Sequence, residues 1–301
     1  MSAFAERTAR PSPGLLEASD PAPATVIRGT SAHWFIVSDH ASNAVPAKLS
    51  QLGLTASALA SHIGWDIGMH TVARRVAARL GATLVEAGFS RLVIDCNRYP
   101  EDPASIPETS GGIAVPGNRG LSARNREQRI DEILVPYQRT VAAELEGVLA
   151  AGGAPVFLSL HSCTPHWQGQ HRPWDIGISW SVDERVARPV IECLQAREDL
   201  CVGDNQPYTL DIGIDFTTPE HAMRRGLAHL QVEFRQDLIA DPEGAIHWAD
   251  VFVDALVQCQ REHRGHWQRE TPCATQGLPM SSLLTRTVST LSRGEREDVR
   301  S

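Results

Sequence analysis

The chain of 301 residues has no long apolar segment and little cysteine. No run approaches the roughly 18 consecutive apolar residues of a transmembrane helix, and the opening residues MSAFAERTARPSPG lack the apolar core of a signal peptide. The six cysteines are scattered and form no CxxC pair, which argues against a cysteine zinc site and a disulfide framework. We therefore expect a cytoplasmic protein with reduced thiols and no membrane partner.

Basic residues are also in deficit, because 28 Lys and Arg stand against 36 Asp and Glu and give a net charge of −8. A nucleic-acid-binding surface needs a basic face, so we expect no nucleic-acid partner. A net negative charge does not exclude a local basic pocket. Hydrophobic residues make up 42% of the chain and charged residues 21%, which supports a large core and excludes global disorder.

Several catalytic signatures are missing as well. There is no HExxH motif and no phosphate-binding Walker loop, and the segment GISWS lacks the second glycine of a serine-hydrolase nucleophile elbow. Cys163 lies two residues after His161, but nothing in the sequence identifies a group that would activate it. Nucleophilic serine and cysteine enzymes are therefore disfavoured.

Strand-like and helix-like segments alternate along the chain. Apolar runs predict strands over 33–38, 82–87, 91–95, 154–160, 175–180 and 229–234, and helical periodicity predicts helices over 55–80, 121–150, 183–197, 218–226 and 243–262. We expect Pro136 to kink the second of these helices. The alternation predicts an α/β three-layer sandwich with a central, mostly parallel sheet and helices on both faces.

The two ends of the chain differ in composition from the middle. Residues 1–30 are rich in Pro, Ala and Ser and predict a flexible arm, and the polar residues 263–301 predict a poorly ordered tail. We expect a single α/β domain over 31–262 and make no prediction of oligomeric state. Within it, the Pro- and Gly-rich segment 99–120 predicts a long surface loop of the kind that is often functional.

Polar side chains stand at the ends of three predicted strands. Asp39 and His40 follow the first strand, His161 follows the strand over 154–160, and Glu233 ends the last. Ligands of open α/β sheets bind beyond the carboxyl ends of the strands, so we expect these side chains to meet.

Two histidines and a carboxylate suit a zinc ion, and three protein ligands leave a fourth position for water. Asp66, which opens a predicted helix, could complete such a set with His40 and His161, while Glu233 could move protons. Alternatives stay open, because Asp66 could cap its helix and Glu233 could pair with Arg235. Other histidines also compete as ligands: His62, His70, His166, His171, His221 and His229.

Six segments in a fixed order carry a more specific signal: SDHASNAVP (38–46), HIGWDIG (62–68), SRLVIDCNR (90–98), LHSCTP (160–165), DNQPY (204–208) and VEFRQDL (232–238). Through them the chain resembles the N-formylglutamate amidohydrolase family. The resemblance implies a fold similar to zinc-dependent exopeptidases and amidases, with a central mixed sheet and a zinc site at the strand ends. It also implies hydrolysis of N-formyl-L-glutamate to formate and L-glutamate, in histidine breakdown.

The resemblance assigns roles residue by residue. His40, Asp66 and His161 match the metal ligands, with Zn²⁺ expected and other divalent metals also suited to such a set. Glu233 matches the glutamate that acts as general base and acid. In amide hydrolysis zinc activates water, and the glutamate protonates the leaving nitrogen.

The resemblance also suggests where the substrate binds. Arg91, Asn97 and Arg98 lie in a segment that resembles a substrate-carboxylate pocket, and Arg235 and Asn205 are further expected contacts. Arginine suits this task because its guanidinium binds a carboxylate through two parallel hydrogen bonds. The expected partner is therefore a small anionic N-acyl amino acid.

Three residues leave questions open. Arg91 could form a salt bridge to Asp95 instead of binding substrate. His221 is a second catalytic candidate that could donate to the oxyanion, or it could be a buried structural histidine. Leu160 stands where the histidine-pathway enzymes carry an acidic residue, so the chemistry is specified more closely than the substrate.

Two other functions remain as alternatives. A zinc exopeptidase or a peptidoglycan-type amidase could use the same scaffold, although a cell-wall role predicts export and the sequence shows no signal peptide. A non-catalytic binding protein could also keep the fold. The complete set of ligands and base argues against it, because a binding protein has no need of the base.

Overall fold

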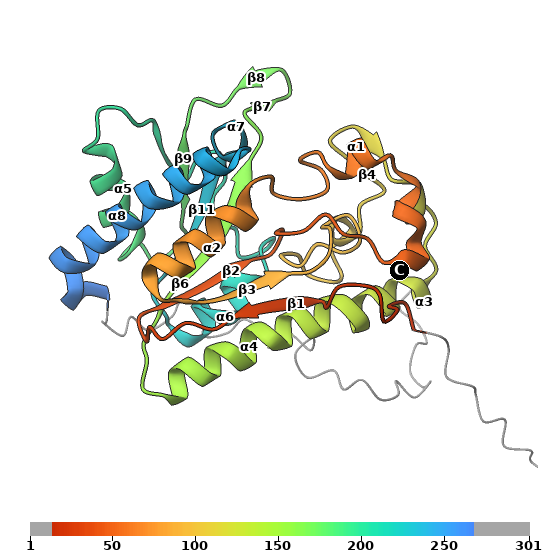
Figure 1. Cartoon of the computed structure of the whole chain (residues 1–301), viewed down its shortest axis with the longest axis horizontal. Helices are drawn as coiled ribbons and strands as arrows, with labels where there is room; N and C mark the ends of the chain where they lie inside the picture. The colour runs from red at the N-terminus through yellow and green to blue at the C-terminus, as the bar shows by residue number, and fades with distance from the viewer. Residues whose placement is uncertain (1–13, 268–301) are drawn as a thin grey trace, which may run out of the picture.

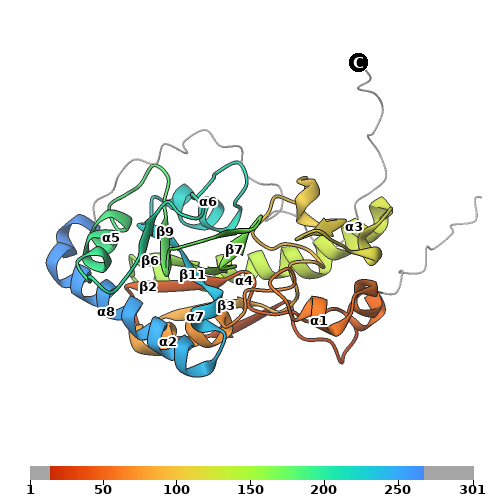
Figure 2. The same cartoon turned by 90° about the horizontal axis from the view of Figure 1, so that it is seen from above.

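The computed structural model describes residues 14–267. Its centre is a seven-stranded sheet in the order β1 (Ala24–Ile27), β3 (Thr83–Ala87), β2 (Trp34–Ser38), β6 (Val156–Cys163), β11 (His229–Arg235), β9 (Ile176–Ser179) and β10 (Val202–Asp204). β1 pairs antiparallel with β3, β9 pairs antiparallel with β11, and the other pairings are parallel. Helices flank the sheet on both faces (Figures 1 and 2), so the predicted α/β class with a mostly parallel mixed sheet is confirmed.

The remaining elements are eight α-helices, short helical turns and two small hairpins. The helices are α1 (Ala56–Leu59), α2 (Met69–Leu80), α3 (Ala123–Arg129), α4 (Val135–Ala150), α5 (Ala187–Gln195), α6 (Thr217–His221), α7 (Gln236–Ile239) and α8 (Pro242–Trp267). The turns are η1 (Ala47–Gly53), η2 (Pro103–Ser105), η3 (Pro116–Asn118), the π-helical η4 (Ile130–Leu134) and η5 (Met223–Arg225). The hairpins are β4 (Thr109–Ser110) with β5 (Ile113–Ala114), and β7 (His166–Trp167) with β8 (Gln170–His171).

Alternate side chains of the central strands feed two hydrophobic cores. In β2, Trp34 and Ile36 pack in one core with α2, α5 and α8, while Phe35 and Val37 pack in the other with α4. Successive strand side chains point to opposite faces, so a continuous apolar run fits a strand that is covered on both sides. In Figure 1, α4 runs along one side of the sheet and α2, α5 and α8 lie on the other.

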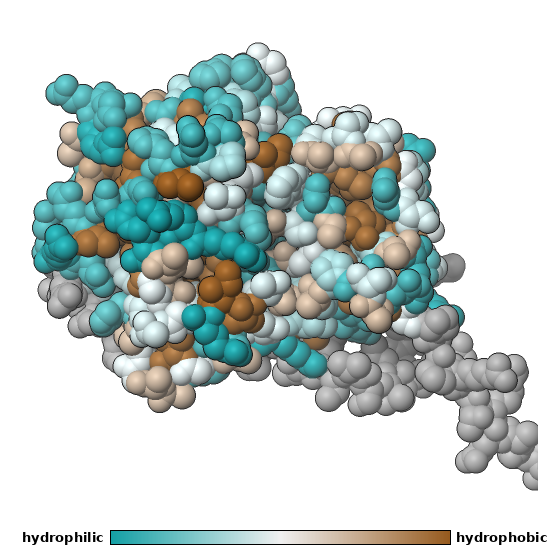
Figure 3. Space-filling model, in the orientation of Figure 1, coloured by the Kyte–Doolittle hydropathy of each residue, from teal (hydrophilic) through white to brown (hydrophobic). Residues whose placement is uncertain are grey.

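Charged side chains cover the outside of the α2–α8 layer. Arg75 and Arg79 of α2 both pair with Asp250 of α8, at 2.8 and 2.7 Å, and Arg79 also reaches Asp254 at 2.9 Å. Figure 3 shows a strongly hydrophilic band over this part of the molecule. This face is therefore a solvated surface.

Two predicted helices are less regular in the structure than expected. The helix expected over 55–80 is split into α1 and α2 by the non-helical residues 60–68. Gly68, directly before α2, takes a left-handed φ of 80°, and a Cβ there would lie 2.0 Å from the carbonyl oxygen of Ile239, so this position requires glycine. The helix expected over 121–150 is continuous but contains the π-helical turn η4 just before Pro136. Proline cannot donate the backbone hydrogen bond there, which is the physical cause of the predicted kink.

Other expectations need correction. Ala24–Ile27, inside the predicted arm, form β1 and pair with β3. Residues 91–95 form a turn instead of a strand; Leu92, Val93 and Ile94 are buried, so their apolar run signalled burial. Helix α8 continues to Trp267, and the rest of the predicted tail lies outside the described residues. No helix within 14–267 is long and apolar enough to cross a membrane.

Candidate active site

A cavity of about 840 Å³ opens beyond the carboxyl ends of β2, β6 and β11. Its lining includes His40, Asp66, His161 and Glu233, together with residues of the long 99–120 segment. In Figure 1 the β7–β8 hairpin and the segment of α1 and β4 rise on either side above this edge of the sheet. The position agrees with the general rule for ligand sites in open α/β sheets.

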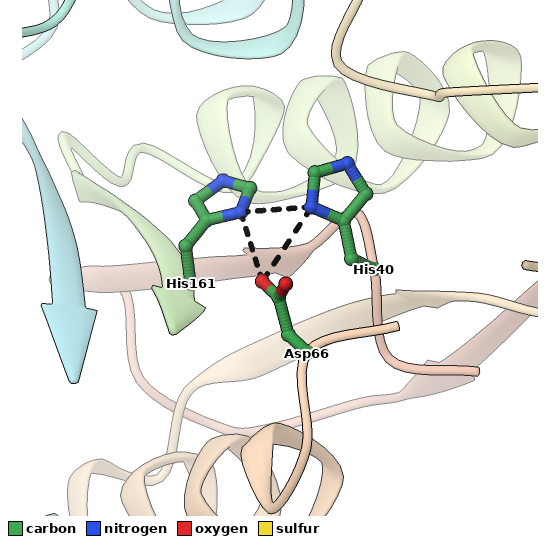
Figure 4. A group of neighbouring side chains, drawn as sticks. All are labelled: His40, Asp66 and His161. Atoms are coloured by element: carbon green, nitrogen blue, oxygen red, sulfur yellow. Dashed lines mark hydrogen bonds and ion pairs between the residues drawn. The ribbon is translucent and has the colours of Figure 1, made fainter. Parts of the chain in front are cut away.

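His40, Asp66 and His161 converge within this cavity (Figure 4). The Nδ1 atoms of the two histidines are 3.2 Å apart, and they lie 3.5 Å (His40) and 3.3 Å (His161) from Oδ2 of Asp66. Tetrahedral coordination at about 2.0–2.2 Å separates ligand atoms by roughly 3.3–3.6 Å. The three side chains therefore fit a divalent metal ion in spacing as well as in donor type.

Asp66 is held in place by both neighbouring segments. Its backbone N–H donates to the carbonyl of His40 at 3.0 Å, and its Oδ2 accepts from the backbone N–H of Ser162 at 3.1 Å. The residue that caps α2 is Gly68, with no side-chain hydrogen bond. The carboxylate of Asp66 thus faces the two histidines, and the alternative of a helix cap is wrong.

The outer ring nitrogen of each histidine faces another carboxylate. His40 Nε2 lies 2.8 Å from Oδ1 of Asp95, and His161 Nε2 lies 3.6 Å from Oδ2 of Asp39 and 3.0 Å from Oγ of Ser159. Asp95 accepts the Nε2 proton of His40, and Ser159 is the hydrogen-bond partner of Nε2 of His161, so the lone pair of each Nδ1 is left free to bind a metal. This hydrogen bonding explains why both Nδ1 atoms point to the centre of the cluster.

Buried hydroxyl groups hold Asp39 in turn. The hydroxyls of Tyr137 and Thr217 donate to its Oδ1 at 2.7 and 2.9 Å, which leaves Oδ2 for His161. Burial alone would lower the pKa of His161, but Asp39 and Asp66 hold that pKa well above its usual range. The carboxylates around the two imidazoles create a negative electrostatic potential that favours a bound cation.

Glu233 lies beside His161 on the adjacent parallel strand, in direct register. The side chain lines the cavity, yet the residue is only 5% exposed and its carboxylate has no hydrogen-bond partner between residues 14 and 267. Burial raises the pKa of Glu233 to about 7. A carboxylate with such a pKa can both accept and return a proton near neutral pH.

Two arginines from the segment after β3 line the cavity and differ in their partners. Arg91 donates to Oδ2 of Asp95 at 2.7 Å and lies 3.8 Å from Oδ1 of Asp66, so the salt bridge considered for it is present. Nη1 of Arg98 is buried and has no hydrogen-bond partner among the described residues. Arg98 is therefore the cation that is better placed to receive an anionic ligand.

Residues 32–240 match the model of the N-formylglutamate amidohydrolase family. The chain belongs to this family. The matched range contains the His40–Asp66–His161 cluster, Glu233, Arg91 and Arg98.

Individual relatives agree with the family. An N-formylglutamate deformylase of Pseudomonas aeruginosa is 31% identical over 100 residues, which are 30% of this chain and only 38% of that protein. The crystal structure of a gene product from Agrobacterium tumefaciens has a TM-score of 0.79 and 32% identity and covers 82% of this chain and 98% of its own. The N-formylglutamate amidohydrolase of Ralstonia eutropha shares the fold, with a TM-score of 0.64 and 19% identity over 81% of this chain and 100% of its own.

Two expected site residues of this family member lie away from the cavity. His221 is completely buried on α6, where its Nε2 donates to Oε1 of Gln138 at 2.7 Å, and it does not reach the cavity wall. Burial, with the charge of Arg225, lowers the pKa of His221 to about 3, so it is a neutral structural histidine.

Arg235 is the second expected residue that does not line the cavity. It pairs with Asp237 at 2.8 Å and Asp175 at 3.2 Å, and it does not pair with Glu233. Strand alternation placed it on the face of Glu233, but it is the last residue of β11 and its side chain turns to neighbouring loops.

The two expected asparagines line the cavity but are partly engaged. Asn97 donates to Asp215 at 2.9 Å, and its Oδ1 accepts from the backbone N–H groups of Phe216 and Thr217, so it positions that loop. Oδ1 of Asn205 accepts from the backbone N–H of Trp180 at 2.8 Å.

Several groups at the site of this family member are not predicted from the sequence. The sequence predicts Asp95 only as a partner for Arg91 and predicts no specific role for Asp39, although each lies in a segment with a family motif. Carboxylates near the candidate histidine ligands were a usable signal for such partners. Trp167 and Tyr208, which line the cavity, and Arg172 behind them had no sequence signal of this kind.

Proposed function

We propose that this protein is a metal-dependent amidohydrolase that cleaves N-formyl-L-glutamate or a related N-acyl amino acid. The observation that carries the proposal is the juxtaposition, in one cavity, of the His40–Asp66–His161 cluster and the unpartnered carboxylate of Glu233. The ligands of a metal and a proton-transfer group are the two components that amide hydrolysis at neutral pH requires.

We propose Zn²⁺ as the metal held by His40, Asp66 and His161. The donor spacing supports this choice, and so do the carboxylates behind both histidines. A zinc ion bound there supplies a Lewis acid for the amide carbonyl and lowers the pKa of water. Other divalent ions accept the same donors, so metal supply also decides which ion is bound.

Glu233 is the proposed general base and general acid. Its carboxylate takes a proton from the attacking water and delivers a proton to the amide nitrogen as the carbon–nitrogen bond breaks. The products are the carboxylate of the acyl group and the free amine of the amino acid. A pKa of about 7, raised by burial, suits both transfers.

Arg98 is the proposed binding group for a substrate carboxylate, with Arg91 and Asn205 beside it in the cavity wall. An unpartnered guanidinium nitrogen supports this role, because burying it without an anion is unfavourable. The name of the Pseudomonas aeruginosa relative supports N-formylglutamate as the first substrate to test. A cytoplasmic location and a part in histidine breakdown complete the proposal.

The test is formate release from N-formyl-L-glutamate by protein of known metal content. Purified protein is assayed as isolated, after chelation, and after addition of zinc to the chelated sample. We expect formate release that is lost on chelation and restored by zinc. Formate release that is unaffected by complete removal of metal contradicts the proposed mechanism, and no release by the zinc-loaded protein contradicts the proposed substrate.

A further inference from the structure

The cavity is large for the substrate from which the family takes its name. N-Formylglutamate has about a dozen non-hydrogen atoms, whereas cavities of roughly 300–1,000 Å³ enclose most of a drug-sized ligand. At about 840 Å³ this cavity is at the upper end of that range. The space beyond the His40–Asp66–His161 cluster and Arg98 therefore has room for an acyl group larger than formyl.

One side of the cavity is formed by aromatic side chains. Seven large hydrophobic residues are exposed in the described part of the chain, and Trp167, Tyr208 and Ile214 line the cavity. Trp167 is 47% exposed and Tyr208 is 42% exposed. Exposed aromatic rings that face a cavity with convergent polar groups are typical of a ligand-binding surface.

Arg172 holds these two rings in place. Its guanidinium carbon lies 5.5 Å from the centre of the Trp167 ring and 4.8 Å from the centre of the Tyr208 ring. Nη2 donates to the hydroxyl of Tyr208 at 2.8 Å, and Nη1 donates to the carbonyl of Thr164 at 3.3 Å. Arg172 is only 8% exposed, so it supports the rings and leaves their outer faces to a ligand. We call Trp167, Arg172 and Tyr208 the aromatic wall.

The aromatic wall is joined to the strand that carries a metal ligand. Strand β6 ends at Cys163, Thr164 follows, and the β7–β8 hairpin with Trp167 begins at His166. Trp167 and Tyr208 line the same cavity as His161 and Glu233. The wall is therefore next to the reacting centre.

The cationic end of the cavity is built from a different part of the chain. Arg91 and Arg98 belong to the segment between β3 and β4, and the backbone of Arg98 forms an isolated antiparallel β-bridge with the backbone of Asp215. In Figure 1, β4 and the β7–β8 hairpin lie on opposite sides of the sheet edge where the cavity opens. The cavity thus offers arginine side chains for the carboxylates of the amino acid and aromatic rings for the acyl group.

We infer that the preferred substrates are anionic N-acyl amino acids whose acyl group is a large apolar or aromatic group packed on the aromatic wall. This inference rests on the proposed function and specifies its substrate class. Water adds to the acyl carbon, the carbon–nitrogen bond breaks, and the products are an apolar carboxylic acid and a free amino acid. The reaction needs no other reactant.

The experiment compares N-phenylacetyl-L-glutamate with N-formyl-L-glutamate. Both release L-glutamate, so one coupled assay measures both with the zinc-loaded protein. We expect kcat/KM for the phenylacetyl substrate to be higher by about tenfold, the scale of burying part of an aromatic ring. We expect Trp167→Ala to remove most of that advantage by lowering kcat/KM for the phenylacetyl substrate more than kcat/KM for the formyl substrate.

Two further variants serve as controls. Trp167→Phe keeps a ring on the wall and is expected to keep the preference. Val182→Ala shortens a more exposed apolar side chain, 62% exposed, that does not line the cavity, and it should change kcat/KM for neither substrate. A wild-type preference for the formyl substrate, or equal losses of both substrates in Trp167→Ala, overturns the inference.

Binding separates this inference from the proposed function. If the zinc-loaded protein hydrolyses neither compound, the proposed function fails, and calorimetric titration with the same two compounds tests the wall alone. Tighter binding of the phenylacetyl compound that is lost in Trp167→Ala supports the aromatic wall. Equal affinities, or no binding of either compound, contradict it.

Discussion

His161 and His221 are both buried histidines, 4% and 0% exposed, on elements that pack against each other, β6 and α6. Their partners differ. His161 faces the carboxylates of Asp39 and Asp66, which raise its pKa, whereas His221 donates to the amide of Gln138, and burial lowers its pKa to about 3. Burial alone thus makes a neutral structural histidine, and neighbouring carboxylates make one that can bind a cation.

The sharpest test of this comparison is to remove each imidazole and measure bound metal. We expect His161→Ala to abolish zinc binding and activity, because two ligands remain where three are needed. The chain should still fold, since the imidazole lies at the cavity end of β6 and outside both hydrophobic cores. Elemental analysis and circular dichroism check the two statements, and full zinc content in the variant would refute the ligand assignment.

The sequence predicts only part of this contrast between His161 and His221, because hydrophobic patterns locate strands and helices but do not identify the neighbours of a side chain. Apolar runs located β2, β6 and β11 and therefore placed His40, His161 and Glu233 at one sheet edge. The same reasoning cannot say what a side chain faces. His221 and Arg235 were expected in the site, and their neighbours, Gln138 and Asp175, come from distant segments.

Pairing between distant segments also explains why two strand predictions were wrong. The four residues of β1 form a strand because they pair with β3. This pairing cannot be predicted from the composition of a short segment in a Pro-rich region. Residues 91–95 had the composition of a strand, yet a turn there brings Asp95 back to His40. That turn supplies the carboxylate that faces His40, a contact that His221 lacks.

The second largest effect on activity is expected from replacement of Glu233. Its carboxylate is a further group beside His161 that has no counterpart beside His221. Glu233→Gln keeps the size of the side chain and removes the proton acceptor, so we expect kcat to fall by about 10²–10⁴-fold while zinc stays bound. Steady-state kinetics of the zinc-loaded variant, with metal content measured on the same sample, provide the test. Loss of zinc along with activity would make Glu233 a ligand instead of a base.

Replacement of the carboxylate behind His40 tests the role of the outer partners. Asp95→Asn is expected to weaken zinc affinity by about 10–100-fold, because the amide no longer fixes the Nε2 proton as strongly. Asp215→Asn is the matched control, since Asp215 is also a buried carboxylate at the cavity but contacts no histidine of the cluster. Competition with a chelator of known affinity measures both variants, and equal losses would show that general charge, not the His40 contact, controls affinity.

The smallest effect on activity is expected at His221. His221→Gln can keep a hydrogen bond to Gln138, so zinc content and kcat should stay within twofold of the wild-type values. Stability should respond to pH instead. The folded pKa of His221, about 3, is below its ordinary value of 6.5, so its contribution to stability is complete above pH 6.5 and is lost as pH falls toward 3.

The variant has no such group to titrate, and the pH dependence of all other groups cancels in the difference between the two proteins. Between pH 6.5 and 4.5 we therefore expect the free energy of unfolding of the wild type to fall by about 2 kcal/mol relative to His221→Gln. Urea unfolding of the metal-free proteins at these two pH values measures the difference. A difference that is constant with pH means that His221 is protonated in the folded state, which would remove the contrast with His161.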